Sequence, residues 1–156
     1  MQNTKSAIST LLICLTILLS GCQSESSNPQ SIVFSFFKEN FILRNFDDSN
    51  EFTKGISKKK NIAEAKKIDN EIRKNSINQL VVFYRETTKK NNTDEKNYQL
   101  FIGDYKQVID FTLKKSYGSW KITKYKSDFF KDPEKMVEFI NSHKWDDTKI
   151  HGENPK

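Results

Sequence analysis

The stretch that decides the fold is residues 108–126, VIDFTLKKSYGSWKITKYK. Apolar and polar side chains alternate before a short SYGS turn, and an alternating segment follows the turn. A side-chain period of two is the pattern of a β-strand with one buried and one open face. In the first segment the apolar set is Ile109, Phe111 and Leu113, and the polar set is Asp110 and Thr112. The stretch therefore predicts an antiparallel hairpin that packs one face on a core.

Two further strand-like segments precede this hairpin. Residues 80–87 are rich in β-branched and aromatic side chains. A charged connection at 89–96 leads to an alternating segment around Tyr98, Leu100 and Ile102. Short connections between sequential strands favour an antiparallel meander with helices on one face and solvent on the other. We therefore expect a curved antiparallel sheet of about four strands.

An apolar helix is predicted before the strands. Asn28 and Pro29 suit the N-cap and the first helical position, and residues 32–46 include nine apolar side chains. Phe37 and Phe41 are four residues apart, as on one face of a helix. Such a helix suits the core, and a partner-binding or membrane-dipping role is the alternative.

Two shorter helices are predicted, one before and one after the strands. Following a loop over 47–55, Ser57 or Asn61 suits the N-cap of a narrowly amphipathic helix. Asp132 and Pro133 begin a short C-terminal helix. Its apolar residues are expected to face inward: Met136, Val137, Phe139 and Ile140. The expected fold class is α+β, with N-terminal helices packed on the meander and a short C-terminal helix.

The strand after the SYGS turn carries a resemblance to a known superfamily. The run Gly118-Ser119-Trp120-Lys121-Ile122-Thr123-Lys124-Tyr125, placed after a helix pair and at the end of a meander, resembles the terminal strand of the NTF2-like, cystatin-type superfamily. The resemblance spans about residues 31–126. It implies a cone-shaped sheet whose hollow binds a small molecule, forms an active site or is filled by side chains. Because the superfamily has many functions, the resemblance fixes none.

The N-terminal residues have the features of a lipoprotein signal. Lys5 precedes an apolar stretch at 7–19 that is too short to span a bilayer. The stretch ends in Leu19-Ser20-Gly21-Cys22, which resembles the lipobox of bacterial lipoproteins. The resemblance implies cleavage before Cys22, a diacylglyceryl group on its sulfur and, usually, acylation of the new amine. A plain secretory signal is the alternative.

These features divide the chain into four parts. We expect a signal peptide at 1–21, the lipidated Cys22 with a flexible tether at 22–30, a single α+β domain at 31–145 and a charged tail at 146–156. The mature protein is then membrane-anchored outside the cytoplasm, because two or three acyl chains give lasting attachment.

The residue after Cys22 bears on which membrane carries the anchor. Gln23 stands where Asp typically signals retention at the inner membrane. The periplasmic face of the outer membrane is therefore expected in a Gram-negative cell. In a Gram-positive cell the expected place is the exterior of the cell membrane.

Composition excludes several classes of site and partner. Cys14 would leave with the signal and Cys22 would be lipidated, so no thiol would remain for a disulfide, a metal or a nucleophile. The formal net charge is +6, mostly from lysines in scattered pairs that are typical of solvated faces. Attraction to anionic lipid is the functional alternative. No nucleic-acid partner is expected for an exported, tethered protein, and the sequence leaves the oligomeric state open.

No catalytic, metal or cofactor motif is predicted, and the chain is not expected to be an enzyme. His143 and His151 lie at the end of the last helix and in the tail, without a spacing suited to a metal. Acidic pairs lack the spaced ligands and glycine of a calcium loop. The glycines near the strands stand alone, so no phosphate-binding loop is expected.

The polar side of the predicted hairpin supplies the candidate pocket. Asp110, Thr112 and Trp120 are the residues expected to line it if the sheet encloses a hollow. A solvent-facing position is the simpler interpretation of Asp110. An apolar enclosure would instead allow this carboxylate to act as a base.

Three classes of function fit these observations. The first is a lipid-anchored, non-enzymatic binding module with an envelope protein as partner, a class that includes immunity and exclusion lipoproteins. The second is an NTF2-like small-ligand binder or enzyme, which predicts a concave cavity with convergent polar groups. The third is a structural envelope lipoprotein, which predicts one contiguous basic face.

Overall fold

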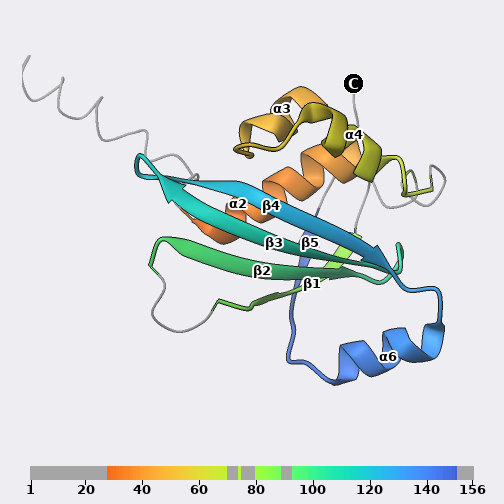
Figure 1. The fold of residues 1–156 in the computed structure, drawn as a ribbon. Coiled ribbons are helices and arrows are strands. Elements are labelled where there is room, and N and C mark those ends of the chain that lie inside the picture. Colours follow the sequence, from red (N-terminus) through yellow and green to blue (C-terminus); the bar gives the residue numbers. More distant parts are fainter. Residues whose placement is uncertain (1–27, 70–73, 75–79, 89–92, 151–156) are drawn as a thin grey trace, which may run out of the picture.

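The computed structural model describes residues 28–69, 74, 80–88 and 93–150 (Figure 1). The predicted signal peptide, Cys22, residues 23–27 of the tether and His151 lie outside the described residues. Within the described ranges, no helix has the length and apolar character needed to cross a membrane.

An antiparallel sheet of five strands organises the fold (Figure 1). The strands are β1 (Leu80–Glu86), β2 (Glu95–Ile102), β3 (Gln107–Ser116), β4 (Ser119–Phe129) and β5 (Asp146–Ile150). Their order across the sheet is β4-β3-β2-β1-β5. The first four are the strands of the predicted meander, and β5 pairs with the free edge of β1.

The expected count of about four strands is therefore wrong. The fifth strand lies in the segment predicted to be a charged tail, so that prediction is also wrong for Asp146–Ile150. The local sequence DDTKI has no apolar alternation, and Ile150 is its only buried residue. The strand forms because β1 offers an unpaired backbone edge, which is tertiary information that a local pattern lacks.

The alternation predicted for β3 is confirmed and sets the two faces of the sheet. Ile109, Phe111 and Leu113 are at most 1% exposed, whereas Asp110 is exposed. Phe111 stands opposite Tyr98 on β2 and Tyr125 on β4, and both of those side chains are buried on the same face.

Four helical segments cover this buried face (Figure 1). They are α2 (Pro29–Phe37), the π-helical segment η2 (Lys38–Leu43), α3 (Phe46–Glu51) and α4 (Lys58–Ala65). The expected cap of α2 is confirmed, since Asn28 Oδ1 accepts from Gln30 N at 3.0 Å. Ser57 rather than Asn61 caps α4, because its Oγ accepts from Lys60 N. The loop expected over 47–55 instead contains most of α3.

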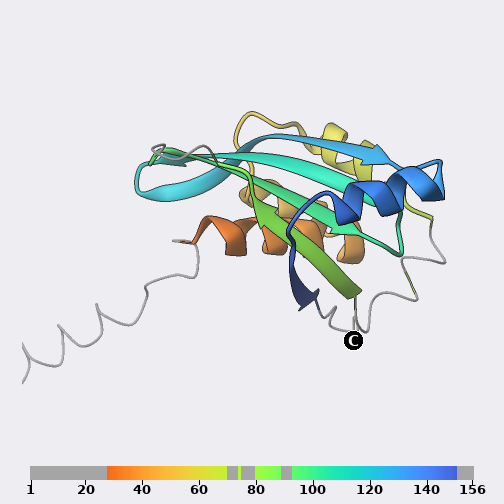
Figure 2. The ribbon, with the colours of Figure 1, turned by 90° about the horizontal axis from the view of Figure 1, so that it is seen from below.

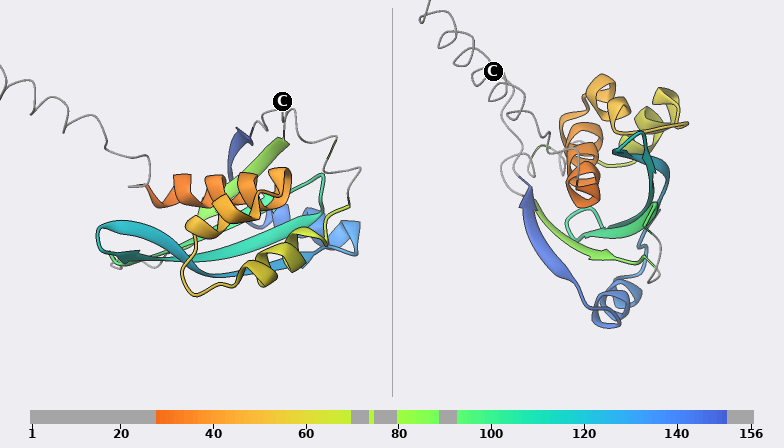
Figure 3. Two further views of the ribbon diagram at one scale, coloured as in Figure 1. Left: turned by 90° about the horizontal axis from the view of Figure 1, so that it is seen from above. Right: turned by 90° about the vertical axis from the view of Figure 1, so that its left-hand side faces the viewer.

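The core lies between α2 and the sheet. Phe36 packs on three aromatic rings, with centroid distances of 6.1 Å to Phe41, 6.0 Å to Phe111 and 5.2 Å to Tyr125. Trp120 belongs to the same cluster and is 7% exposed. Figure 3 shows the sheet curving around α2, so side chains fill its concave side.

The last helix, α6 (Pro133–Asn141), lies on the opposite face of the sheet (Figures 1 and 2). Its expected cap is confirmed, since Asp132 Oδ1 accepts from Glu134 N at 3.0 Å. Phe139 packs against Phe101 of β2. The prediction that Val137 faces inward is wrong, because this side chain is 51% exposed. A helix that rests on a sheet by one narrow stripe leaves the rest of its apolar residues uncovered.

Truncation of the buried aromatics tests this core. We expect Phe111→Ala or Trp120→Ala to lower the free energy of unfolding by about 3–5 kcal/mol, the usual cost of removing a buried aromatic side chain. Val137→Ala on exposed α6 is the control and should change it by no more than about 0.5 kcal/mol. Urea denaturation followed by circular dichroism measures all three, and unchanged midpoints for the core variants would contradict the packing.

Candidate functional site

The side of the sheet away from α2 carries the candidate site. We call its polar part the open face, which comprises Asn97 and Gln99 of β2, Asp110 and Thr112 of β3, and Lys124 and Lys126 of β4. Gln99 is buried, whereas Asp110, Lys124 and Lys126 are exposed. The pairing register arranges these residues in two rows across the strands. One row is Gln99, Asp110 and Lys126, and the other is Asn97, Thr112 and Lys124.

Hydrogen bonds fix the first row. Arg85 Nε donates to Gln99 Oε1 at 2.9 Å, and Gln99 Nε2 donates to Asp110 Oδ1 at 2.7 Å. The Arg85 guanidinium lies 5.2 Å from the centre of the Trp145 ring. Burial lowers the pKa of Arg85, and the charge of Asp110 acts in the opposite direction. These contacts hold three long side chains in defined positions.

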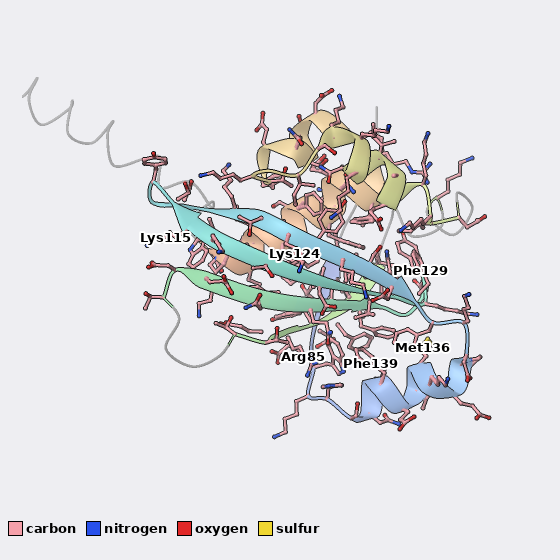
Figure 4. The ribbon with its side chains drawn as sticks, in the orientation of Figure 1. Arg85, Lys115, Lys124, Phe129, Met136 and Phe139 are labelled. Carbon is pink, nitrogen blue, oxygen red and sulfur yellow. The ribbon has the colours of Figure 1, made fainter. Side chains whose placement is uncertain are left out.

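The second row contains one exposed lysine, Lys124. Thr112 Oγ1 donates to Asn97 Oδ1 at 2.9 Å. Lys124 stands beside this pair in the middle of β4 (Figure 4), and it has no ion pair with any described residue. Lys126 differs because its Nζ lies 2.7 Å from Asp128 Oδ2, a pair that contributes little at such exposure.

Two hollows meet at Asp110 and Thr112. The larger has a volume of about 430 Å³ and is lined by Thr87, Thr88, Glu95, Asn97, Tyr98, Asp110, Phe111 and Thr112. The smaller has a volume of about 220 Å³ and is lined by Asp110, Thr112, Lys124 and Lys126. The two predicted residues on β3 are therefore neighbours on one surface.

The third predicted pocket residue lies elsewhere. Trp120 is buried on the helix-covered face, so grouping it with Asp110 and Thr112 is wrong. The hairpin register places it there, since Trp120 pairs with Lys115 and Ile122 pairs with the buried Leu113. A β-bulge follows on β4, because Leu113 pairs with Ile122 but Thr112 pairs with Lys124. The extra residue, Thr123, reverses the side-chain alternation of β4 at that point.

The same bulge explains why sequence reasoning missed part of the site. Unbroken alternation from Trp120 would place Lys124 and Lys126 in the core, where unpaired ammonium groups are costly. The sequence does contain a signal of this register shift, because two lysines flank the buried Tyr125.

The chemistry that these residues support is recognition by hydrogen bonds and charge. Asp110 is exposed rather than enclosed by apolar groups, so the structure does not provide the apolar enclosure proposed for a catalytic base. His143 Nδ1 lies 2.9 Å from the Phe139 carbonyl oxygen at the end of α6. In the described part of the chain, no group of three or more His, Cys, Asp or Glu residues is placed to hold a metal ion.

No family model, curated protein or solved structure matches this chain. A proposal for its function therefore rests on the sequence and on the geometry of the open face.

The tyrosine beside the larger hollow gives a prediction for pH dependence. Burial, followed by the charge of Glu86, raises the pKa of Tyr98 to about 12. An unfolded tyrosine titrates near pH 10, so the contribution of Tyr98 to stability is complete below about pH 10 and is lost as pH rises through about 12. We expect alkaline unfolding in this window, followed by phenolate absorbance and circular dichroism. Tyr98→Phe should move the midpoint to higher pH, and an unchanged midpoint would contradict the assignment.

Proposed function

We propose that this protein is a lipid-anchored lipoprotein of the cell envelope whose domain binds a protein partner through the open face. The lipobox-like run ending at Cys22 supports the anchor. The observation that carries the binding role is the exposed ammonium of Lys124, which has no ion pair with any described residue, beside the ordered side chains of the open face. In this proposal the protein is not an enzyme.

The order of these rows favours binding. Side chains already held by hydrogen bonds lose less rotamer entropy when a partner arrives. Arg85, Gln99 and Asp110 are held in this way, as are Thr112 and Asn97. Lys124 adds a charge that an acidic group on the partner would neutralise. An envelope protein with exposed carboxylates is therefore the partner proposed, and an immunity or exclusion role belongs to the same class.

A small polar ligand is the second candidate. The hollow of about 430 Å³ brings hydroxyl, amide and carboxylate groups together, and its size suits a small molecule. An NTF2-like protein is expected to bind its ligand on the concave side of the sheet, but Phe36 and its neighbours fill that side here. The ligand would therefore bind on the opposite face. A structural role is less favoured, because Asp110 and Asp128 interrupt the lysines and the face is not uniformly basic.

Metabolic labelling with a fatty-acid analogue tests the anchor. We expect Cys22→Ala to abolish labelling and leave the precursor uncleaved, because this thiol is the proposed acceptor of the diacylglyceryl group. Cys14→Ala is the matched control and should label normally, since that residue would leave with the signal peptide. Equal labelling of Cys22→Ala and wild type would show that the lipoprotein assignment is wrong.

Site-specific photo-crosslinking tests the binding face. A photoreactive residue in place of Lys126 should give an adduct with an envelope protein in intact cells. The same residue in place of exposed Lys59 on α4 should give none. Adding Lys124→Glu should weaken binding by about tenfold or more, because the reversed charge would face the partner's carboxylate.

The outcomes separate the two candidate functions. An adduct that is insensitive to Lys124→Glu would contradict the proposed charge pairing. An absence of protein adducts, together with ligand-dependent protection of the Lys126 site in the purified domain, would favour the small ligand instead.

A further inference from the structure

The tip of the β3–β4 hairpin carries an aromatic residue that the domain does not use for packing. Tyr117 is 104% exposed and has a φ of 50°. Gly118 follows with a φ of 83°. Two consecutive residues with positive φ are typical of a tight hairpin turn, where Asn-Gly is the favoured pair. A tyrosine at the first position strains the backbone and gains no burial in return.

Three lysines near this tip have no ion pair with a carboxylate of the described residues. Lys54 Nζ donates to Ser116 Oγ at 3.0 Å, and Lys121 Nζ donates to the backbone oxygen of Glu51 at 2.6 Å. Both acceptors are uncharged. Lys115 forms no ion pair with any of the residues described, whereas the adjacent Lys114 lies 3.4 Å from Glu95. The hairpin tip is therefore a basic patch around an exposed aromatic ring.

The described chain begins at the same end of the domain. Figures 2 and 3 show α2 starting beside the hairpin end of the sheet and running away from it. The six residues from Cys22 to the start of the described chain at Asn28 span at most about 20 Å when fully extended.

We propose that Lys54, Lys115, Tyr117 and Lys121 form a surface that contacts anionic phospholipid headgroups. The proposal rests on the lipid anchor at Cys22, which would hold this end of the domain within about 20 Å of the bilayer. Lysines near an anionic membrane are attracted to it, and tyrosine favours the boundary between headgroups and acyl chains. The contact sets the orientation of the domain on its anchor.

The exposed apolar surface at Val137 does not suit a membrane of this charge. Val137 on α6 is 51% exposed, and Glu134 and Glu138 line the same shallow pocket. An anionic bilayer would repel these carboxylates. Val137 therefore provides a matched control position for the contact at Tyr117.

Quenching by brominated lipid tests the contact. The mature chain from Cys22 onward is coupled through that thiol to a maleimide lipid in vesicles of brominated phosphatidylcholine, with or without phosphatidylglycerol. We expect the added emission of Tyr117→Trp to be quenched when phosphatidylglycerol is present and restored at about 1 M salt, which screens charges beyond a few ångströms. The added emission of Val137→Trp should remain unquenched in both vesicles.

Charge variants complete the test. Combined Lys54→Gln, Lys115→Gln and Lys121→Gln should remove the quenching at position 117. The control set Lys131→Gln, Lys135→Gln and Lys144→Gln removes the same number of lysine charges elsewhere and should leave the quenching intact. Tyr117→Asn should raise Tm by relieving the backbone while leaving no aromatic group at the tip.

The results distinguish this proposal from the anchor itself. Because the chain is attached chemically, a failure of native lipidation would not alter the quenching. Equal quenching at positions 117 and 137, or quenching that ignores phosphatidylglycerol and the three lysines, would overturn the headgroup contact.

Discussion

The packing of Phe36 against Phe111 and Tyr125 is the constraint on which the rest of the structure depends. This packing places Ile109, Phe111 and Leu113 of β3 on the helix-covered face. Since the side-chain period of a strand is two, Asp110 and Thr112 must then lie on the other face. A shift of one residue in register would bury both polar groups and expose Phe111. The core therefore determines which residues are available for recognition.

The bulge at Thr123 extends this effect to β4. It allows Trp120 and Ile122 to share the core with Tyr125, although strict alternation would separate them. The same shift places Lys124 and Lys126 outward, beside Thr112 and Asp110. Because of this one extra residue, β4 places its aromatic side chains in the core and its two lysines on the open face. Bulges often reorient side chains in this way at functional surfaces.

Local signals account for the parts of the fold that could be predicted. The caps at Asn28 and Asp132 and the alternation of β3 are readable because each depends on neighbours in sequence. The strand β5 could not be predicted, since its pairing comes from the edge of β1 and its own residues have no apolar period. Of the candidate site, Asp110 and Thr112 follow from alternation. Lys124 does not, because its position depends on cross-strand register.

The two proposed surfaces are compatible because they lie at different positions along the strands of the same sheet. The headgroup contact lies at the hairpin tip, and its nearest member on β4, Lys121, is three residues from Lys124. At about 3.3 Å per residue, this places Lys124 roughly 10 Å from Lys121 along the strand. That separation exceeds the Debye length of about 8 Å at physiological salt. With β4 directed away from the bilayer, a partner at Lys124 would bind more than one Debye length from the headgroups, where the field of the membrane is largely screened.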